Sequence, residues 1–140
     1  MNIGIVGIGV VGSAIKHGFE KLGHSTVVHD LKMDTKIEDV LNTDIVFICV
    51  PTPSKPNGDC DTKIVENVVL KLSKLNFEGI VSIKSTVKPG TTEMLIEKFP
   101  NLNLSFVPEF LRERCAISDF LENHDLCVIG TDDKNTFDLI

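Results

Sequence analysis

Three glycines near the N-terminus constrain the fold of this chain more than any other feature. The apolar stretch from Ile3 to Val6 predicts a short buried strand. Gly7, Gly9 and Gly12 follow with the spacing G-x-G-x-x-G, and residues 11–22 have the amphipathic pattern of a helix. In such a strand–turn–helix unit the glycines allow a tight turn, close approach of a ligand and close packing of helix on strand. Free N–H groups at the helix start then favour a bound phosphate, so the pattern predicts a dinucleotide site.

A second strand and an acidic residue follow at the spacing that a dinucleotide site requires. Gly23 ends the helix, residues 25–29 are predicted to form a strand, and Asp30 lies at its carboxyl end. About 20 residues beyond the glycines, a carboxylate can accept hydrogen bonds from an adenosine ribose. It would also repel a 2′-phosphate, which favours NAD over NADP, although Lys32 lies two residues further on. The alternative is that Asp30 caps a turn.

Composition and charge exclude several classes of partner. With 140 residues, 42% of them hydrophobic and 24% charged, the chain can form one globular domain with a real core. Its net charge is −6 and its Lys and Arg residues are scattered, so we expect no nucleic-acid partner and no anionic membrane surface. No apolar run approaches the roughly 18 residues of a membrane span, and Met1 leads directly into a strand.

The cysteines predict a reduced, cytoplasmic protein without a metal site. The four cysteines have no metal-ligand spacing and no C-x-x-C pair. Cys49 and Cys127 lie in apolar, strand-like runs, where a buried free thiol is expected.

Strand and helix patterns alternate along the rest of the chain. Further strands are predicted at 44–50, 80–84, 102–107 and 126–129, helices at 37–41, 62–75 and 93–98 and near the C-terminus, and a loop at 54–61. Together they predict an α/β fold of the doubly wound (Rossmann) type, with a six-stranded parallel sheet and helices on both faces, in a single domain over residues 1–140. Ligands of such sheets bind outside the carboxyl ends of the strands.

The polar clusters of the chain follow predicted strand ends, which favours one composite site. Thr52 and Thr86 can each offer a hydroxyl to a ligand or water, with turn and cap chemistry as the alternative. Pro51 and Pro53 stiffen the loop around Thr52. Lys84 ends a buried strand, and we expect it to extend to water.

A pair of carboxylates follows the strand predicted at 102–107. Glu109 and Glu113 are four residues apart and would share one face of a helical turn, where they could orient a water as a general base. Arg112 would point elsewhere on that helix. A solvated helical face is the alternative that the spacing alone favours.

These segments together resemble the N-terminal NAD-binding domain of the UDP-glucose/GDP-mannose dehydrogenase family. The matching stretches are residues 7–12, Asp30, 50–53 with Gly58 and Asp61, 84–91 (KSTVKPGT), 108–113 (PEFLRE), Ala116, 119–120 and 128–130. The KSTVKPGT and PEFLRE segments are far more specific than the glycine motif. Dehydrogenases of the related β-hydroxyacid type, a third candidate class, would share only the glycines.

The resemblance implies a function and a set of site residues. Enzymes of this family oxidise the C6 alcohol of a nucleotide sugar to a carboxylate and pass two hydrides to two NAD⁺. The resemblance implies that Gly7, Gly9, Val10, Val11 and Asp30 hold the adenosine diphosphate part of NAD, and that Val50, Pro51, Thr52, Thr86 and Glu113 line its nicotinamide side. Thr86 and Glu109 would be catalytic, placing a water and the sugar, and Glu109, Phe110 and Leu111 would bind the substrate.

The chain also departs from the family pattern. The catalytic cysteine, the central helix and the C-terminal UDP-binding domain come from later segments that this chain does not contain, and the helical insertion after the second strand is missing. Val107 and Arg114 replace residues that are usual next to the PEFLRE segment. We therefore expect an NAD-binding domain that is incomplete for catalysis alone, with a UDP-sugar as the substrate. Its expected partner is a second copy in a homodimer or a chain that carries the missing complementary domain. The alternative is a non-catalytic nucleotide-binding or regulatory module.

Overall fold

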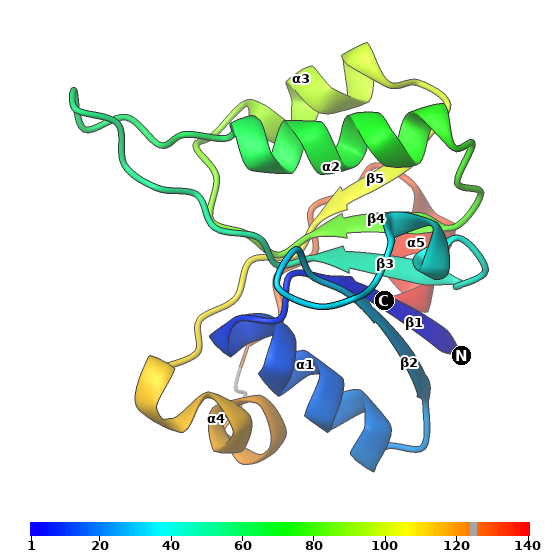
Figure 1. The fold of residues 1–140 in the computed structure, drawn as a ribbon, viewed down its shortest axis with the longest axis vertical. Coiled ribbons are helices and arrows are strands. Elements are labelled where there is room, and N and C mark those ends of the chain that lie inside the picture. Colours follow the sequence, from blue (N-terminus) through cyan, green and yellow to red (C-terminus); the bar gives the residue numbers. More distant parts are fainter. Residues whose placement is uncertain (124–125) are drawn as a thin grey trace.

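A five-stranded parallel sheet forms the centre of the protein (Figure 1). The computed structural model describes residues 1–123 and 126–140. The strands are β1 (Asn2–Val6), β2 (Ser25–His29), β3 (Ile45–Ile48), β4 (Ile80–Ile83) and β5 (Asn103–Phe106), in the order β2-β1-β3-β4-β5. All four neighbouring pairs are parallel. The predicted doubly wound α/β fold is confirmed, and the strand order reverses between β1 and β3.

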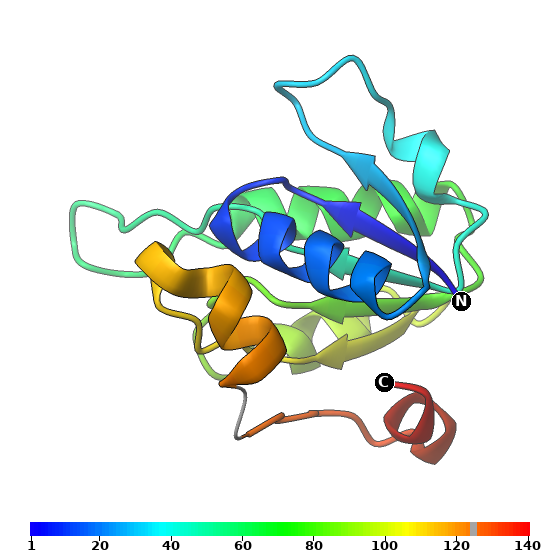
Figure 2. The same cartoon turned by 90° about the horizontal axis from the view of Figure 1, so that it is seen from below.

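Helices cover both faces of the sheet, as Figures 1 and 2 show. Helix α1 (Val10–Lys21) and helix α4 (Ala116–Glu122) lie on one face, and α2 (Lys63–Lys74) and α3 (Thr91–Lys98) on the other. Two short 3-10 helices are η1 (Ile37–Val40) and η2 (Glu113–Cys115), and the last helix is α5 (Lys134–Leu139). Helix α5 is tied to the start of β5, where the Asn103 side-chain amide donates to Thr136 Oγ1 at 2.6 Å.

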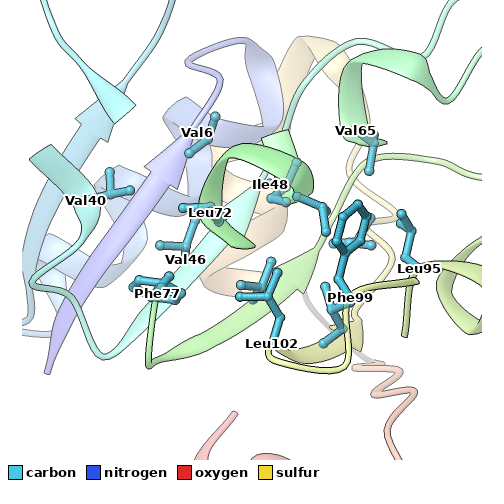
Figure 3. Close-up of a cluster of buried hydrophobic side chains, with 14 of the residues drawn as sticks. Val6, Val40, Val46, Ile48, Val65, Leu72, Phe77, Leu95, Phe99 and Leu102 are labelled. Carbon is cyan, nitrogen blue, oxygen red and sulfur yellow. The ribbon is translucent and has the colours of Figure 1, made fainter. Parts of the chain in front are cut away.

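The central strands are buried on both faces because their sequences are apolar without alternation. In β3 every residue of the run Ile-Val-Phe-Ile is buried. Val46 and Ile48 pack under α2 and α3 with Leu72, Leu95 and Phe99 (Figure 3). On the other face, Ile5 of β1 and Phe47 of β3 pack in one cluster with Ile15 of α1. At roughly 1.5–3 kcal/mol for each large side chain, this burial is the main stabilising contribution of the sheet.

The predicted sixth strand is wrong. Residues 126–129 form no strand, and the segment pairs with the sheet only through one antiparallel bridge between Gly130 and Phe106. A parallel strand beside β5 would need a crossover connection. The helix that follows β5 packs on α1 instead, and the chain then meets β5 running in the opposite direction. Leu126 and Cys127 consequently stay exposed, so the prediction of a buried thiol at Cys127 is also wrong.

Helix α4 was not anticipated from the sequence, yet it packs closely on α1. A Cβ atom at Gly18 of α1 would overlap the ring of Phe120 in α4. The Phe120 ring also meets the Phe19 ring edge-on at 5.8 Å between centroids, and Phe19 stacks on Phe47 of β3 at 5.5 Å. The missing side chain at Gly18 therefore makes the notch that receives α4.

None of the helices in the described part of the chain is long and apolar enough to cross a membrane.

The close packing of Phe120 against Gly18 predicts that a side chain at position 18 lowers the stability of the protein. Gly18→Ala should destabilise the protein by about 1–2 kcal/mol, because the overlap with Phe120 outweighs the gain of about 1 kcal/mol in helix propensity. His17→Ala, at an exposed site in the same helix, is the control. Urea unfolding measures both, and a Gly18→Ala protein as stable as the wild type would contradict the packing.

Candidate functional site

The glycine loop after β1 is wedged between the ends of β2 and β3. Gly7 has φ of +97°, and its N–H donates to the His29 carbonyl at 2.8 Å. A Cβ at Gly7 would lie 2.6 Å from the Cys49 carbonyl oxygen, and one at Gly12 would overlap the carbonyl of Gly7. A Cβ at Gly9, in contrast, would meet no atom within 4 Å. The loop is therefore fixed on its inner side and open at Gly9.

The start of α1 presents free backbone N–H groups to this opening. Gly9 is the N-cap, no side chain of the described residues caps the helix, and its first turn holds no acidic residue. The N–H groups of Val10, Val11 and Gly12 have no partner within the helix, because the helix begins after Gly9 and offers no carbonyl one turn before them. Such a terminus suits a pyrophosphate, which the positive end of the helix dipole also favours.

Asp30 holds the glycine loop as well as its own turn. Its carboxylate accepts the N–H of Lys32 and the N–H of Ile8, each at 2.8 Å, and these two bonds lower the pKa of Asp30. The bond to Lys32 is the turn-capping role weighed above, and the bond to Ile8 could not be predicted from spacing. A carboxylate has about four acceptor positions, so room remains for ribose hydroxyls.

The ends of β3 and β4 are joined by Ser85. The Ser85 hydroxyl is within donating distance of two carbonyl oxygens, that of Val50 at 2.8 Å and that of Ile48 at 3.2 Å. This fixes the exit of β3, from which exposed Pro51 and half-buried Thr52 follow. The role of Ser85 was not recognised in the sequence.

The predicted loop at 54–61 is a hairpin that projects from the carboxyl edge (Figure 1). Ser54 and Cys60 form an antiparallel bridge, and the Cys60 thiol donates to the Thr86 carbonyl at 3.5 Å. Thr86 is exposed at this edge. The hairpin therefore lies beside Thr86.

Lys84 is buried, so the expectation that it extends to water is wrong. Its ammonium lies 2.9 Å from Glu109 Oε2, and the two side chains are 6% and 3% exposed. Glu109 comes from the segment after β5 and covers the lysine, which also lies over the Phe47 ring at 5.8 Å from its centroid. Glu109 Oε1 accepts the N–H of Phe110 at 3.1 Å.

Glu109 and Glu113 do not share a helical face, which corrects a second expectation. Glu109 lies in a segment without helical structure, whereas Glu113 begins η2 and is exposed. Within residues 1–123 and 126–140, no hydrogen bond or ion pair joins Glu113 to Glu109 or Thr86, and Glu109 is bonded to Lys84 and Phe110 instead. The four-residue spacing fails because the turn begins only at Glu113.

Arg112 turns toward α4 and pairs with Asp119. The Asp119 carboxylate accepts three bonds from Arg112, from the backbone N at 3.0 Å, from Nε at 2.9 Å and from Nη2 at 2.6 Å. The guanidinium holds the pKa of Asp119 well below its usual range. Asp119 was noted only as part of a motif, and its role depends on a helix that was not predicted.

Between these two ion pairs lies a hollow of about 440 Å³. It is lined by Glu109, Phe110, Leu111, Arg112, Asp119, Asn123 and Leu126. The Phe110 side chain is 64% exposed at its rim. The hollow thus combines apolar walls with a buried carboxylate, which suits a ligand that carries both a ring and hydroxyl groups.

The contacts run without a break along the carboxyl edge of the sheet. Asp30 reaches the glycine loop, the loop touches the end of β3, Ser85 ties β3 to β4, and Lys84 ties β4 to Glu109. The residues singled out after each strand are therefore brought to one edge, centred on the switch point of the sheet, where open α/β sheets bind ligands. Glu113 is the exception.

In the described part of the chain this edge holds no metal-binding cluster, and its buried cysteine, Cys49, is not a reactive thiol. Among the described residues no group of three or more His, Cys, Asp or Glu side chains could hold a metal ion. Cys49 packs against the core beneath α1, and burial raises the pKa of its thiol to about 12. A thiol with that pKa is protonated at neutral pH and is a poor nucleophile.

The Arg112–Asp119 pair predicts a pH dependence of stability. Asp119 has a lower pKa in the folded protein than its ordinary value of 3.8. Its contribution is therefore complete above that value and is lost as the pH falls toward the folded pKa. The difference in unfolding free energy between wild type and Asp119→Asn should be largest at neutral pH and shrink below about pH 4. Asp34→Asn, an exposed site, is the control, and a difference that stays constant into acid would refute the pairing.

The chain is similar to known dehydrogenases that act on nucleotide sugars. The profile described as "UDP-glucose/GDP-mannose dehydrogenase family, NAD binding domain" matches residues 27–140. UDP-glucose 6-dehydrogenase of Rickettsia bellii is 40% identical over 108 residues, which are 74% of this chain and 25% of that enzyme. Thus the chain spans about a quarter of the length of this relative.

Solved structures show the same arrangement of elements. The UDP-glucose dehydrogenase of Pyrobaculum islandicum superposes with a TM-score of 0.87 at 27% identity, covering 99% of this chain and 42% of that one. A ternary complex of GDP-mannose dehydrogenase of Pseudomonas aeruginosa gives 0.82 at 28% identity, with 99% and 43% covered. The chain belongs to the UDP-glucose/GDP-mannose dehydrogenase family, as its NAD-binding domain.

Proposed function

We propose that this chain is the NAD-binding domain of a nucleotide-sugar 6-dehydrogenase that acts on a UDP-sugar. The observation that carries the proposal is the bond between Asp30 and the Ile8 N–H. It holds the carboxylate that would bind a ribose next to the glycine loop that leads into the open helix start, where a pyrophosphate would bind. The match of residues 27–140 to the family profile supports the same assignment.

In this proposal the cofactor lies across the switch point. Gly7, Gly9, Val10, Val11 and Asp30 hold its adenosine diphosphate half, and Val50, Pro51, Thr52, Thr86 and Glu113 line its nicotinamide half. NAD supplies the acceptor for a hydride from the sugar C6 alcohol. Thr86 and Glu109 place the water and the sugar, and Phe110 and Leu111 contact the sugar in the hollow.

We also propose that the domain binds without completing the reaction. The family oxidises an alcohol to a carboxylate through a cysteine nucleophile, and such a group must form a thiolate. Cys49 is unsuited to this because burial raises its pKa to about 12. The relatives are far longer than the matched stretch, so residues beyond it, or a partner chain, supply the nucleophile. The alternative, a binding module with no catalytic role, shares the cofactor site.

The cofactor site is tested by titration calorimetry with NAD⁺. Asp30→Ala should weaken binding by about 1–3 kcal/mol, because the ribose loses its acceptor and the glycine loop loses its tie at Ile8. Because the carboxylate would repel a 2′-phosphate, the wild type should bind NADP⁺ more weakly than NAD⁺. Asp34→Ala, four residues on, is the matched control and should bind NAD⁺ like the wild type. Equal NAD⁺ affinity of wild type and Asp30→Ala would refute the role of Asp30.

Turnover is tested by mixing the protein with UDP-glucose and NAD⁺ and following NADH absorbance. We expect NAD⁺ binding without steady NADH production, since the buried Cys49 thiol is protonated at neutral pH and unsuited to act as the nucleophile. Steady production would show that the described residues suffice for catalysis. NAD⁺ binding with no response to any nucleotide sugar would favour the binding module.

A further inference from the structure

The contribution of the buried Lys84–Glu109 ion pair to stability does not explain why the pair is buried. Both charged ends are removed from water, with their side chains 6% and 3% exposed. Removing two charges from water costs more than a single contact at 2.9 Å reliably returns, and well-packed apolar residues often stabilise a protein as much. The position of the pair, at the rim of the hollow, suggests a different purpose.

The pair fixes the orientation of a carboxylate. Glu109 Oε2 is held by the Lys84 ammonium, and Oε1 is held by the N–H of Phe110 at 3.1 Å. Two donors from different segments therefore define both the place and the plane of the carboxylate. A carboxylate has about four acceptor positions, so these two bonds leave others for a ligand in the hollow that Glu109 lines.

Lys84 is the cation that holds the Glu109 carboxylate, because the neighbouring groups are paired elsewhere or neutral. Arg112, the next cation along the segment, is committed to Asp119 on the other side of the hollow. The Cys49 thiol is near Lys84 and Glu109, but burial raises its pKa, so it remains neutral. The Lys84 ammonium itself lies over the Phe47 ring, 5.8 Å from its centroid, and this second contact restricts its position.

We infer that Lys84 is a positioning residue, whose ammonium aims the Glu109 carboxylate so that it accepts a hydrogen bond from a hydroxyl of a sugar bound in the hollow. The inference rests on the proposed function, because it takes the ligand of the hollow to be a nucleotide sugar. It assigns Lys84 no direct contact with the substrate.

The first test is spectroscopic and needs no ligand. The Phe110 amide signal reports on Glu109 Oε1, to which it donates. Lys84→Met should shift this signal and speed its hydrogen exchange by about tenfold or more, the loss of one hydrogen bond to a charged group. Lys84→Arg, which keeps the charge, should restore both values. Lys88→Met, an exposed site on the same loop, is the matched control. An unchanged Phe110 signal in Lys84→Met would overturn the inference.

The second test uses UDP-glucose in the presence of NAD⁺, followed on the Phe110 and Leu111 amide signals. Wild type and Lys84→Arg should show saturable shifts of these signals. Lys84→Met should need about tenfold more UDP-glucose to reach half of the maximal shift. The double variant Lys84→Met with Glu109→Leu replaces the pair by apolar groups, so it should fold even if Lys84→Met does not. It should melt near the wild-type temperature and show no such response. A double variant that responds like the wild type, or a wild type that does not respond, would overturn the inference.

Calorimetry with NAD⁺ on the same samples separates this inference from the proposed function. If the wild type fails to bind NAD⁺, the proposed function fails, while the Phe110 signal still decides whether Lys84 sets Glu109. If NAD⁺ binds and Lys84→Met matches the wild type in both tests, only the role of Lys84 fails.

Discussion

The wedging of the glycine loop between the ends of β2 and β3 is the constraint on which the rest of the site depends. Gly7 can adopt its positive φ and lie against the Cys49 carbonyl only without a side chain. Asp30 then fastens the same loop from the other side through the Ile8 N–H. The open helix start is thereby preformed, so a bound pyrophosphate would not have to order it. Preformed sites of this kind lose less conformational entropy on binding.

Three consecutive residues after β4 divide three tasks among them. Lys84 points to the α1 face and pairs with Glu109, while Ser85 ties the exit of β3. Thr86 is left exposed at the edge. Because successive side chains of an extended segment point to opposite faces, one short segment can hold both of its neighbours and still present a hydroxyl.

Helix α1 also supports the far wall of the hollow. Its start faces the glycine loop, while Gly18, further along, receives Phe120 of α4. Asp119, the residue before Phe120, holds Arg112 and so fixes the segment that carries Phe110. Packing on the outer side of α1 is thus linked through α4 to the shape of the hollow. The two ion pairs hold this segment from both ends, which leaves Phe110 and Leu111 between them.

The sequence by itself determined the fold class, the first β-α-β unit and the edge at which polar residues gather, because strand and helix periodicity and glycine spacing are local properties. It also carried the family, through the KSTVKPGT and PEFLRE segments. Only the tertiary structure decided that residues 126–129 stay outside the sheet, that Lys84 is buried, and that Glu109 and Glu113 do not share a helical face. Each of these outcomes depends on contacts between distant segments. Helix α4 packs on α1 before the chain reaches residues 126–129, and Glu109 covers Lys84 in the ion pair. Partners separated by many residues leave no periodic signal in the sequence, so their pairing appears only when the chain is folded.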